Sequence, residues 1–102
     1  MSYVSTMTVQ VKPDTAKAAL AAFVQQRIFA ECKHALPGFD RGELLQSTSE
    51  PEQILIIAHW QTLADLEAWQ LHPVRARQLQ DLSHFAVSVS ASNTYHVSHC
   101  YP

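Results

Sequence analysis

The chain predicts an α+β fold in which an antiparallel sheet carries its helices on one face only. Three observations support this fold class. Strand-like and helix-like segments follow the order βαββαβ, a short polar turn joins the second and third strands, and an apolar stripe runs along the first helix. This order is that of a ferredoxin-like split βαβ unit. We expect one domain over residues 1–102, because no repeat, linker or low-complexity segment divides the chain.

The first strand and the first helix follow from two different periodicities. Residues 3–11 alternate loosely between apolar and polar side chains, as a half-buried strand does. Pro13 ends this strand, and Asp14 is a candidate N-cap for the helix that follows. Apolar side chains then recur at every fourth position over residues 16–32, which predicts one long helix with a single apolar stripe. The stripe is Ala16, Leu20, Val24, Ile28 and Cys32, joined by Ala19 and Phe23 at the companion spacing of three.

The middle of the chain predicts an antiparallel hairpin. A Pro-Gly pair ends the long helix, and "FDRGELLQ", residues 39–46, reads as the second strand. The polar segment "STSEPE" connects it to a third strand over residues 54–60. Because the connection is short, the two strands should be antiparallel neighbours.

The third predicted strand has no polar face suited to contact with solvent. Residues 54–57 are apolar on both parities, whereas an antiparallel strand with one exposed face should alternate. Something must cover the second face, and the predicted helices already lie on the first. We therefore expect a homodimer in which a second copy packs its sheet against this one across a two-fold axis. The alternative is a monomer whose C-terminal strand folds back over its own sheet.

Two short helices and a last strand complete the order. Thr62 and Asp65 form a capping-box pattern that begins the first of these helices, and Pro73 suits the first position of the second. A last strand region spans residues 85–101, with a break at Ser92 and Asn93.

Composition and charge exclude several classes of function. The net charge of −2 provides no basic stripe for nucleic acid and no charge block for a membrane surface. The N-terminal segment has neither the cationic nor the apolar region of a signal peptide, so we expect a cytoplasmic protein. Cys32 and Cys100 are far apart with no CxxC spacing, and His96 and His99 would point to opposite faces of a strand. We expect no metal site.

The segment "LPGFDRGELLQSTSEPEQILIIAHWQTLADLEAWQLHPVRARQLQDL", residues 36–82, resembles the antibiotic biosynthesis monooxygenase domain of the dimeric α/β barrel superfamily. The matching features are a Pro-Gly-Phe before the second strand, a third strand that ends in Trp, a polar turn, a short helix and a helix begun by Pro. The resemblance implies a ferredoxin-like fold that dimerises into an α/β barrel. The superfamily includes cofactor-independent oxygenases of polycyclic phenols, quinol oxygenases, haem-degrading enzymes and members with no known activity.

The resemblance also identifies individual positions. Trp60 matches a tryptophan that lies beside the substrate in the anthrone-oxidising branch of the superfamily. That branch has an asparagine, a tyrosine and an arginine at positions that hold Ile56, Leu66 and Leu79 here. In the haem-degrading branch, Trp69 matches a pocket tryptophan, but the iron-ligating histidine also falls at Leu79.

Five side chains are candidates for a functional site. His59 and Trp60 are neighbours on a strand and point to opposite faces, and His59 is the candidate general base. Trp60 and Trp69 are candidate pocket walls, with plain core packing as the alternative. Phe23, on the inward stripe of the first helix, would contribute to the roof of the pocket, and His72 would make a polar contact at its mouth.

The function predicted from these features is a cofactor-independent monooxygenase that uses dioxygen on an aromatic phenol or quinol held in an apolar pocket. The resemblance implies that neither metal nor flavin is needed, since an electron-rich phenolate can reduce dioxygen directly. A non-catalytic ligand-binding or dimerisation module of the same fold is the alternative, and isomerase-like or decarboxylase-like chemistry is a further one.

Overall fold

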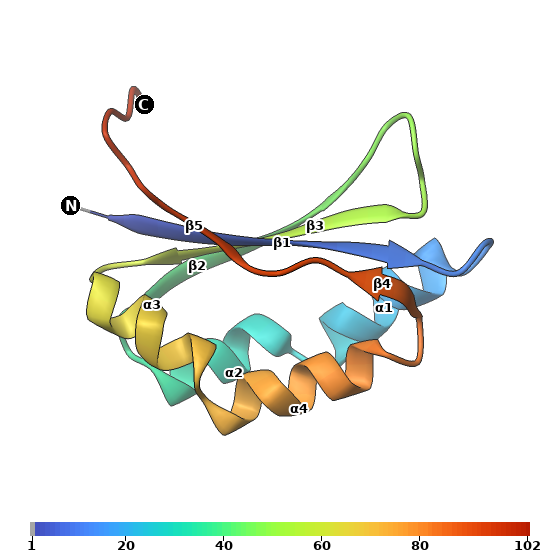
Figure 1. Cartoon of the computed structure of the whole chain (residues 1–102), viewed down its shortest axis with the longest axis horizontal. Coiled ribbons are helices and arrows are strands. Elements are labelled where there is room, and N and C mark those ends of the chain that lie inside the picture. The colour runs from blue at the N-terminus through green and yellow to red at the C-terminus, as the bar shows by residue number, and fades with distance from the viewer. Residues whose placement is uncertain (1) are drawn as a thin grey trace.

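The structure is a computed structural model that describes residues 2–102, and four helices lie against one face of its sheet (Figure 1). Its elements in chain order are β1 (Tyr3–Val11), α1 (Ala16–Gln25), α2 (Ile28–Ala35), β2 (Phe39–Gln46), β3 (Gln53–Trp60), α3 (Leu63–Gln70), α4 (Pro73–Leu82), β4 (Ala86–Val89) and β5 (Asn93–His96). The predicted α+β fold class is confirmed.

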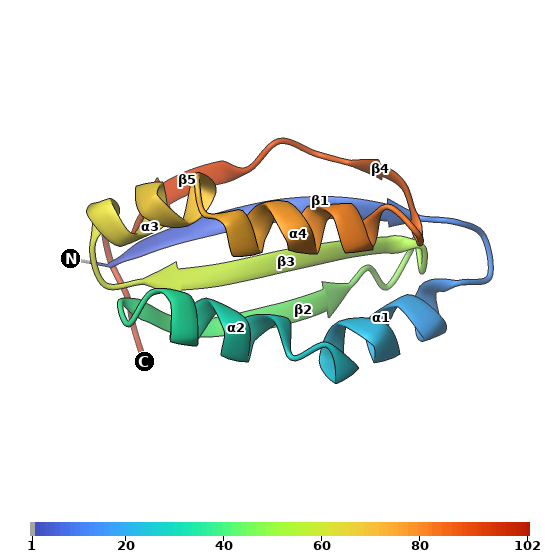
Figure 2. The ribbon, with the colours of Figure 1, turned by 90° about the horizontal axis from the view of Figure 1, so that it is seen from below.

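The sheet is antiparallel throughout and has the strand order β2-β3-β1-β4, with β5 also paired to β1. β4 and β5 lie along the same edge of β1, one at each end (Figure 2). This arrangement is that of a ferredoxin-like fold, as predicted. The central strands β1 and β3 pair along almost their whole length, so they form the rigid floor on which the helices rest.

The single long helix predicted over residues 16–32 is wrong. It divides into α1 and α2 because Arg27 adopts a left-handed backbone with a φ of 55°, which ends the run of helical hydrogen bonds. The apolar stripe divides with it. Phe23 and Ile28 are buried, but Val24 is 69% exposed, so a strict spacing of four did not define one buried face.

Asp14 is not the N-cap of α1, contrary to the prediction. Its own backbone is left-handed, with a φ of 64°, and the capping position belongs to Thr15. The Thr15 hydroxyl does not cap the helix but donates to the Lys12 carbonyl at 2.6 Å, which closes the turn after β1.

Other local predictions are confirmed. The hairpin of β2 and β3 is antiparallel, and the Thr62 hydroxyl accepts a hydrogen bond from the Asp65 N–H at 3.1 Å at the start of α3. Pro73 is the first residue of α4. The last strand is interrupted as predicted, but the break covers residues 90–92, so Asn93 already belongs to β5, and β5 ends at His96 and does not extend to residue 101.

The core consists of two clusters of buried side chains between the sheet and the helices. One lies under α1 and α4 and comprises Val9, Val11, Ala16, Ala19, Phe23, Ile28, Ile54 and Leu82. The other lies under α2 and α3 and comprises Cys32, Phe39, Ala58, Trp60, Leu66 and Trp69. Within residues 2–102, no helix is long and apolar enough to cross a membrane.

Candidate functional site

A cavity lies between the sheet and the helices, at the junction of the two core clusters. Its interior volume is about 60 Å³, and the empty space reaches about 660 Å³ only when the adjoining open solvent is counted. Ile56 and Ala58 of β3 form part of its floor. Phe23 of α1 and Phe29 of α2 form part of its roof, so the break between these helices lies directly over the cavity.

One side of the cavity is lined by residues of β1, the β4–β5 connection and α4. Ser92 of the connection lines it, together with Gln78 and Leu79 of α4. The Ser90 N–H donates to the Thr8 carbonyl at 2.8 Å, and the connection then leaves the edge of β1 before β5 begins (Figure 2). The interruption of the last strand therefore opens the sheet edge beside the cavity.

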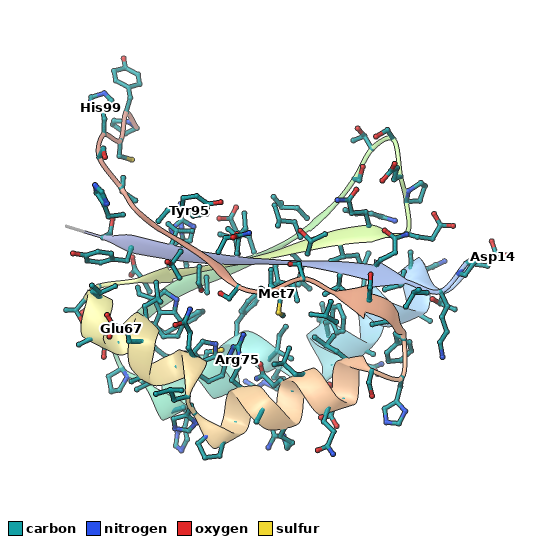
Figure 3. The ribbon with its side chains drawn as sticks, in the orientation of Figure 1. Met7, Asp14, Glu67, Arg75, Tyr95 and His99 are labelled. Carbon is teal, nitrogen blue, oxygen red and sulfur yellow. The ribbon has the colours of Figure 1, made fainter. Side chains whose placement is uncertain are left out.

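Two further side chains lie at this edge. Figure 3 shows Met7 pointing from β1 toward the helices and Arg75 pointing from α4 toward the sheet. Both line the cavity. They bring one thioether and one cationic group to an otherwise mainly apolar wall.

A row of aromatic rings forms the wall at the α3 end. Trp69 faces the cavity and is 7% exposed, and its ring centroid is 5.9 Å from that of Trp60. Trp60 is completely buried and does not line the cavity itself, and it packs edge-on against Phe39. The His72 ring also stacks against Trp69, with 5.9 Å between the two ring centroids.

Trp60 is connected to the cavity indirectly, by a hydrogen bond to a residue that lines it. Its indole N–H donates to the Ser5 hydroxyl oxygen at 3.0 Å, and both groups are buried. Ser5 lines the cavity. Because a hydroxyl group carries one proton as well as two lone pairs, Ser5 still has a donor to offer a ligand.

The five predicted site residues fall into three groups. Phe23 and Trp69 line the cavity, as expected of pocket walls. Trp60 and His72 lie behind Trp69, and the His72 Nδ1 accepts from the Val74 N–H at 3.1 Å to cap α4. His59 lies on the opposite face of the sheet.

The position of His59 follows from strand alternation. Its β3 neighbours Ala58 and Trp60 point toward the helices, so His59 points away from them. Its Nε2 atom lies 3.0 Å from the Glu43 Oε1 on β2. The predicted base is therefore separated from the cavity by the sheet itself, and its catalytic role stays a prediction.

The cavity offers no strong ionisable base among its described lining residues, which include neither histidine nor carboxylate. Cys32 lines it, but burial and the nearby charge of Glu31 raise the pKa of its thiol to about 12. The thiol is thus protonated at neutral pH. In residues 2–102, no group of three or more histidine, cysteine or acidic side chains is arranged to hold a metal ion.

The sequence profile of the antibiotic biosynthesis monooxygenase family matches residues 2–77. The chain belongs to this family. Its membership confirms the resemblance found in the sequence and agrees with the observed fold. A search of curated proteins finds no significant match.

Solved structures share the fold of this family member. Rv0793 from Mycobacterium tuberculosis has a TM-score of 0.75 at 14% identity, with 100% of each chain covered. Protein SO0527 from Shewanella oneidensis has a TM-score of 0.73 at 18% identity, covering 94% of this chain and 90% of its own. SnoaB, a cofactor-independent oxygenase from Streptomyces nogalater, has a TM-score of 0.66 at 19% identity, covering 99% and 95%. At these identities the likeness shows the fold.

Two positions that are polar in the anthrone-oxidising branch are apolar walls in this family member. Ile56 and Leu79 both line the cavity, and the third such position, Leu66, is buried in the core. Sequence reasoning missed the polar residues that line the cavity, which include Ser5 and Arg75. The signal for Arg75 was its spacing, because it lies four residues before the inward-facing Leu79 on the same side of α4.

Proposed function

We propose that this protein is a cofactor-independent monooxygenase that binds a planar phenol or quinol in the cavity under the helices. The observation that carries the proposal is the shape and lining of this cavity: it is mainly apolar, bounded by Trp69 and Phe23, and lies in a member of the monooxygenase family. SnoaB, which has the same fold, is a cofactor-independent oxygenase.

Such a site needs little chemistry from the protein. A deprotonated phenol or quinol donates an electron to dioxygen, the two recombine to a peroxide, and the peroxide loses water. One oxygen atom enters the product, and the other leaves as water with two hydrogens of the substrate. The cavity contributes by excluding solvent and by holding the ring against Trp69.

Ser5 and Trp60 would orient the polar edge of the substrate. The Trp60 N–H fixes the Ser5 oxygen, which leaves the Ser5 hydroxyl proton to donate to a substrate oxygen. Trp60 is thus a positioning residue in this proposal, and His72 fixes the ring of Trp69 by stacking.

A homodimer is the second part of the proposal. The face of the sheet that points away from the helices, here called the open face, carries Val4, Leu45, Leu55, Ile57, His59 and Tyr95. Leu45 is 43% exposed and Tyr95 is 56% exposed. A second copy packed on this face would bury these side chains, and the hydrophobic effect favours that burial. Light scattering that reports 11.4 kDa at micromolar concentration would refute the dimer.

A binding module without catalysis is the second candidate. It is favoured by one observation, the lack of histidine and carboxylate among the described lining residues, because an apolar cavity can bind a ligand without reacting with it. Isomerase-like chemistry would differ from both candidates in giving a product without added oxygen.

Oxygen uptake distinguishes these functions. Purified, metal-stripped protein is assayed against hydroquinones, naphthols and anthrones, with heat-denatured protein as the control for autoxidation. The proposal predicts saturable uptake above that control and oxygen from dioxygen in the product. No uptake across the panel would favour the binding module, and turnover without oxygen incorporation would favour an isomerase.

A further inference from the structure

We propose that Arg75 makes the cavity selective for aromatic anions, with the ring of the ligand inside the cavity and its negatively charged oxygen beside the Arg75 guanidinium. The inference takes from the proposed function only that the cavity binds an aromatic ligand, and it adds the charge of that ligand and the residue that recognises it.

The position of Arg75 is the first argument. It lies in the first turn of α4, is half-buried, points toward the sheet (Figure 3) and lines the cavity. Its neighbours in the cavity wall include the apolar side chains of Met7 and Leu79. Its guanidinium group therefore brings a positive charge to this part of the cavity wall.

The lack of a counterion is the second argument. Among the described residues, the ion pairs found within 4.0 Å do not include Arg75. Its hydrogen bond to the Gln70 carbonyl is long, at 3.4 Å, and engages only one of its nitrogens. A guanidinium group has five N–H donors, so most of them remain available for a ligand.

Arg77 provides the contrast, two residues further along the same helix. It pairs with Glu31 and lies 4.0 Å from Asp81, and its side chain is 52% exposed. Burial raises the pKa of Glu31, but hydrogen bonds from Arg77 and Gln78 and the charge of Arg77 outweigh this effect and lower it overall. The Glu31 carboxylate is therefore already paired with Arg77.

A ligand oxygen would complete the site. Planar guanidinium donors match carboxylate and phenolate oxygens, and hydrogen bonds between charged groups are stronger than those between neutral ones. The positive charge also lowers the pKa of a phenol bound beside it. Arg75 would thereby favour the deprotonated ligand in a cavity whose described lining residues include neither histidine nor carboxylate.

The test compares two ligands of nearly the same shape. Calorimetry measures binding of 2-naphthoate and of the neutral 2-naphthalenemethanol at pH 8 to the wild-type protein and two variants. Arg75→Gln removes the charge from the cavity wall, and Arg77→Gln removes an equal charge from the outer surface of the same helix. Circular dichroism checks that both variants are folded.

We expect the wild-type protein to bind naphthoate about ten-fold or more tightly than the alcohol, the range typical of a charged hydrogen bond. Arg75→Gln should abolish this preference by weakening binding of naphthoate far more than binding of the alcohol, whereas Arg77→Gln should keep the preference. Equal affinities in the wild type, no binding of either ligand, a preference retained in Arg75→Gln, or an equal loss in Arg77→Gln would each overturn the inference.

These outcomes are separate from the test of oxygenase activity, because binding is measured without turnover. A preference for naphthoate in a protein that takes up no oxygen would keep the role of Arg75 and refute the monooxygenase. Turnover of neutral substrates by a protein with no preference for the anion would support the monooxygenase and refute the role of Arg75.

Discussion

The two faces of the sheet are built from the same strands but have opposite environments. Toward the helices, Val9, Ile54 and Trp60 are completely buried. On the open face, Tyr95 is 56% exposed and the His59 side chain is 18% exposed beside Glu43. Strand alternation therefore divides the molecule into a closed side that holds the cavity and an apolar side that is available to a second copy. The difference shows that two adjacent residues can lie in unrelated environments: Trp60 packs in the core, whereas His59 lies beside Glu43 on the open face.

The largest expected effect is on the closed face. Trp60→Ala should lower the free energy of unfolding by about 3–5 kcal/mol, because it leaves a cavity in the core and removes the hydrogen bond to Ser5. Urea denaturation measures this change. Tyr95→Ala on the open face should cost less than about 1 kcal/mol when measured on dilute protein, where a second copy contributes least. If both variants lost a similar amount of unfolding free energy, the two faces would not differ in their contribution to stability.

Gly42 provides a second comparison within one strand. It lies on β2 opposite Ala58, at a position whose side chain would point toward the helices. A Cβ atom there would overlap the ring of Phe29. We expect Gly42→Ala to cost about 1–3 kcal/mol, as overpacking does, and to shift a wall of the cavity. Glu43→Ala, one residue further and on the open face, is the control. A neutral effect of Gly42→Ala in thermal unfolding would show that Phe29 can move freely.

The open face has its own test. Ile57→Lys places a charge at the centre of this face and should convert a dimer into a monomer in sedimentation equilibrium, because an unpaired charge is costly to bury. Its effect on the stability of the monomer should be smaller than that of Trp60→Ala. Val24→Lys, at a position 69% exposed on α1, should leave the mass unchanged. A dimer that persists in Ile57→Lys would place the interface elsewhere.

The smallest effect concerns the ion pair between Glu31 and Arg77. The lowered pKa of Glu31 stabilises the folded state above the usual carboxyl value of 4.5, and this contribution is lost as the pH falls through the lower folded value. Glu31→Gln should therefore cost less than about 1 kcal/mol at pH 7, and the cost should shrink in acid. Unfolding curves at pH 7 and below pH 4 would show the trend, and a cost independent of pH would refute it.

Much of the fold could be predicted because its signals are local. Alternation, the polar turn, Thr62 and Pro73 each act through their immediate neighbours. The break at Arg27 could not be predicted, since a left-handed backbone at a residue other than glycine has no clear sequence pattern.

The site was harder to predict than the fold. Alternation predicted that His59 and Trp60 point to opposite faces, but it could not say which face holds the cavity. The role of Arg75 depends on how α4 packs over the sheet, which is a tertiary property. The resemblance to the anthrone-oxidising branch identified the positions of Ile56 and Leu79, but it did not identify Arg75, which lies one turn before Leu79 on α4.

The most direct test of the account is the rate of oxygen consumption, measured with the best substrate of the panel, in Met7→Phe and in His59→Ala. Met7→Phe narrows the cavity from the closed side, and misplacing the substrate there should lower turnover about ten-fold or more. His59→Ala changes only the open face and should leave turnover close to that of the wild type. Loss of turnover in His59→Ala together with normal turnover in Met7→Phe would contradict the account and return the chemistry to the other side of the sheet.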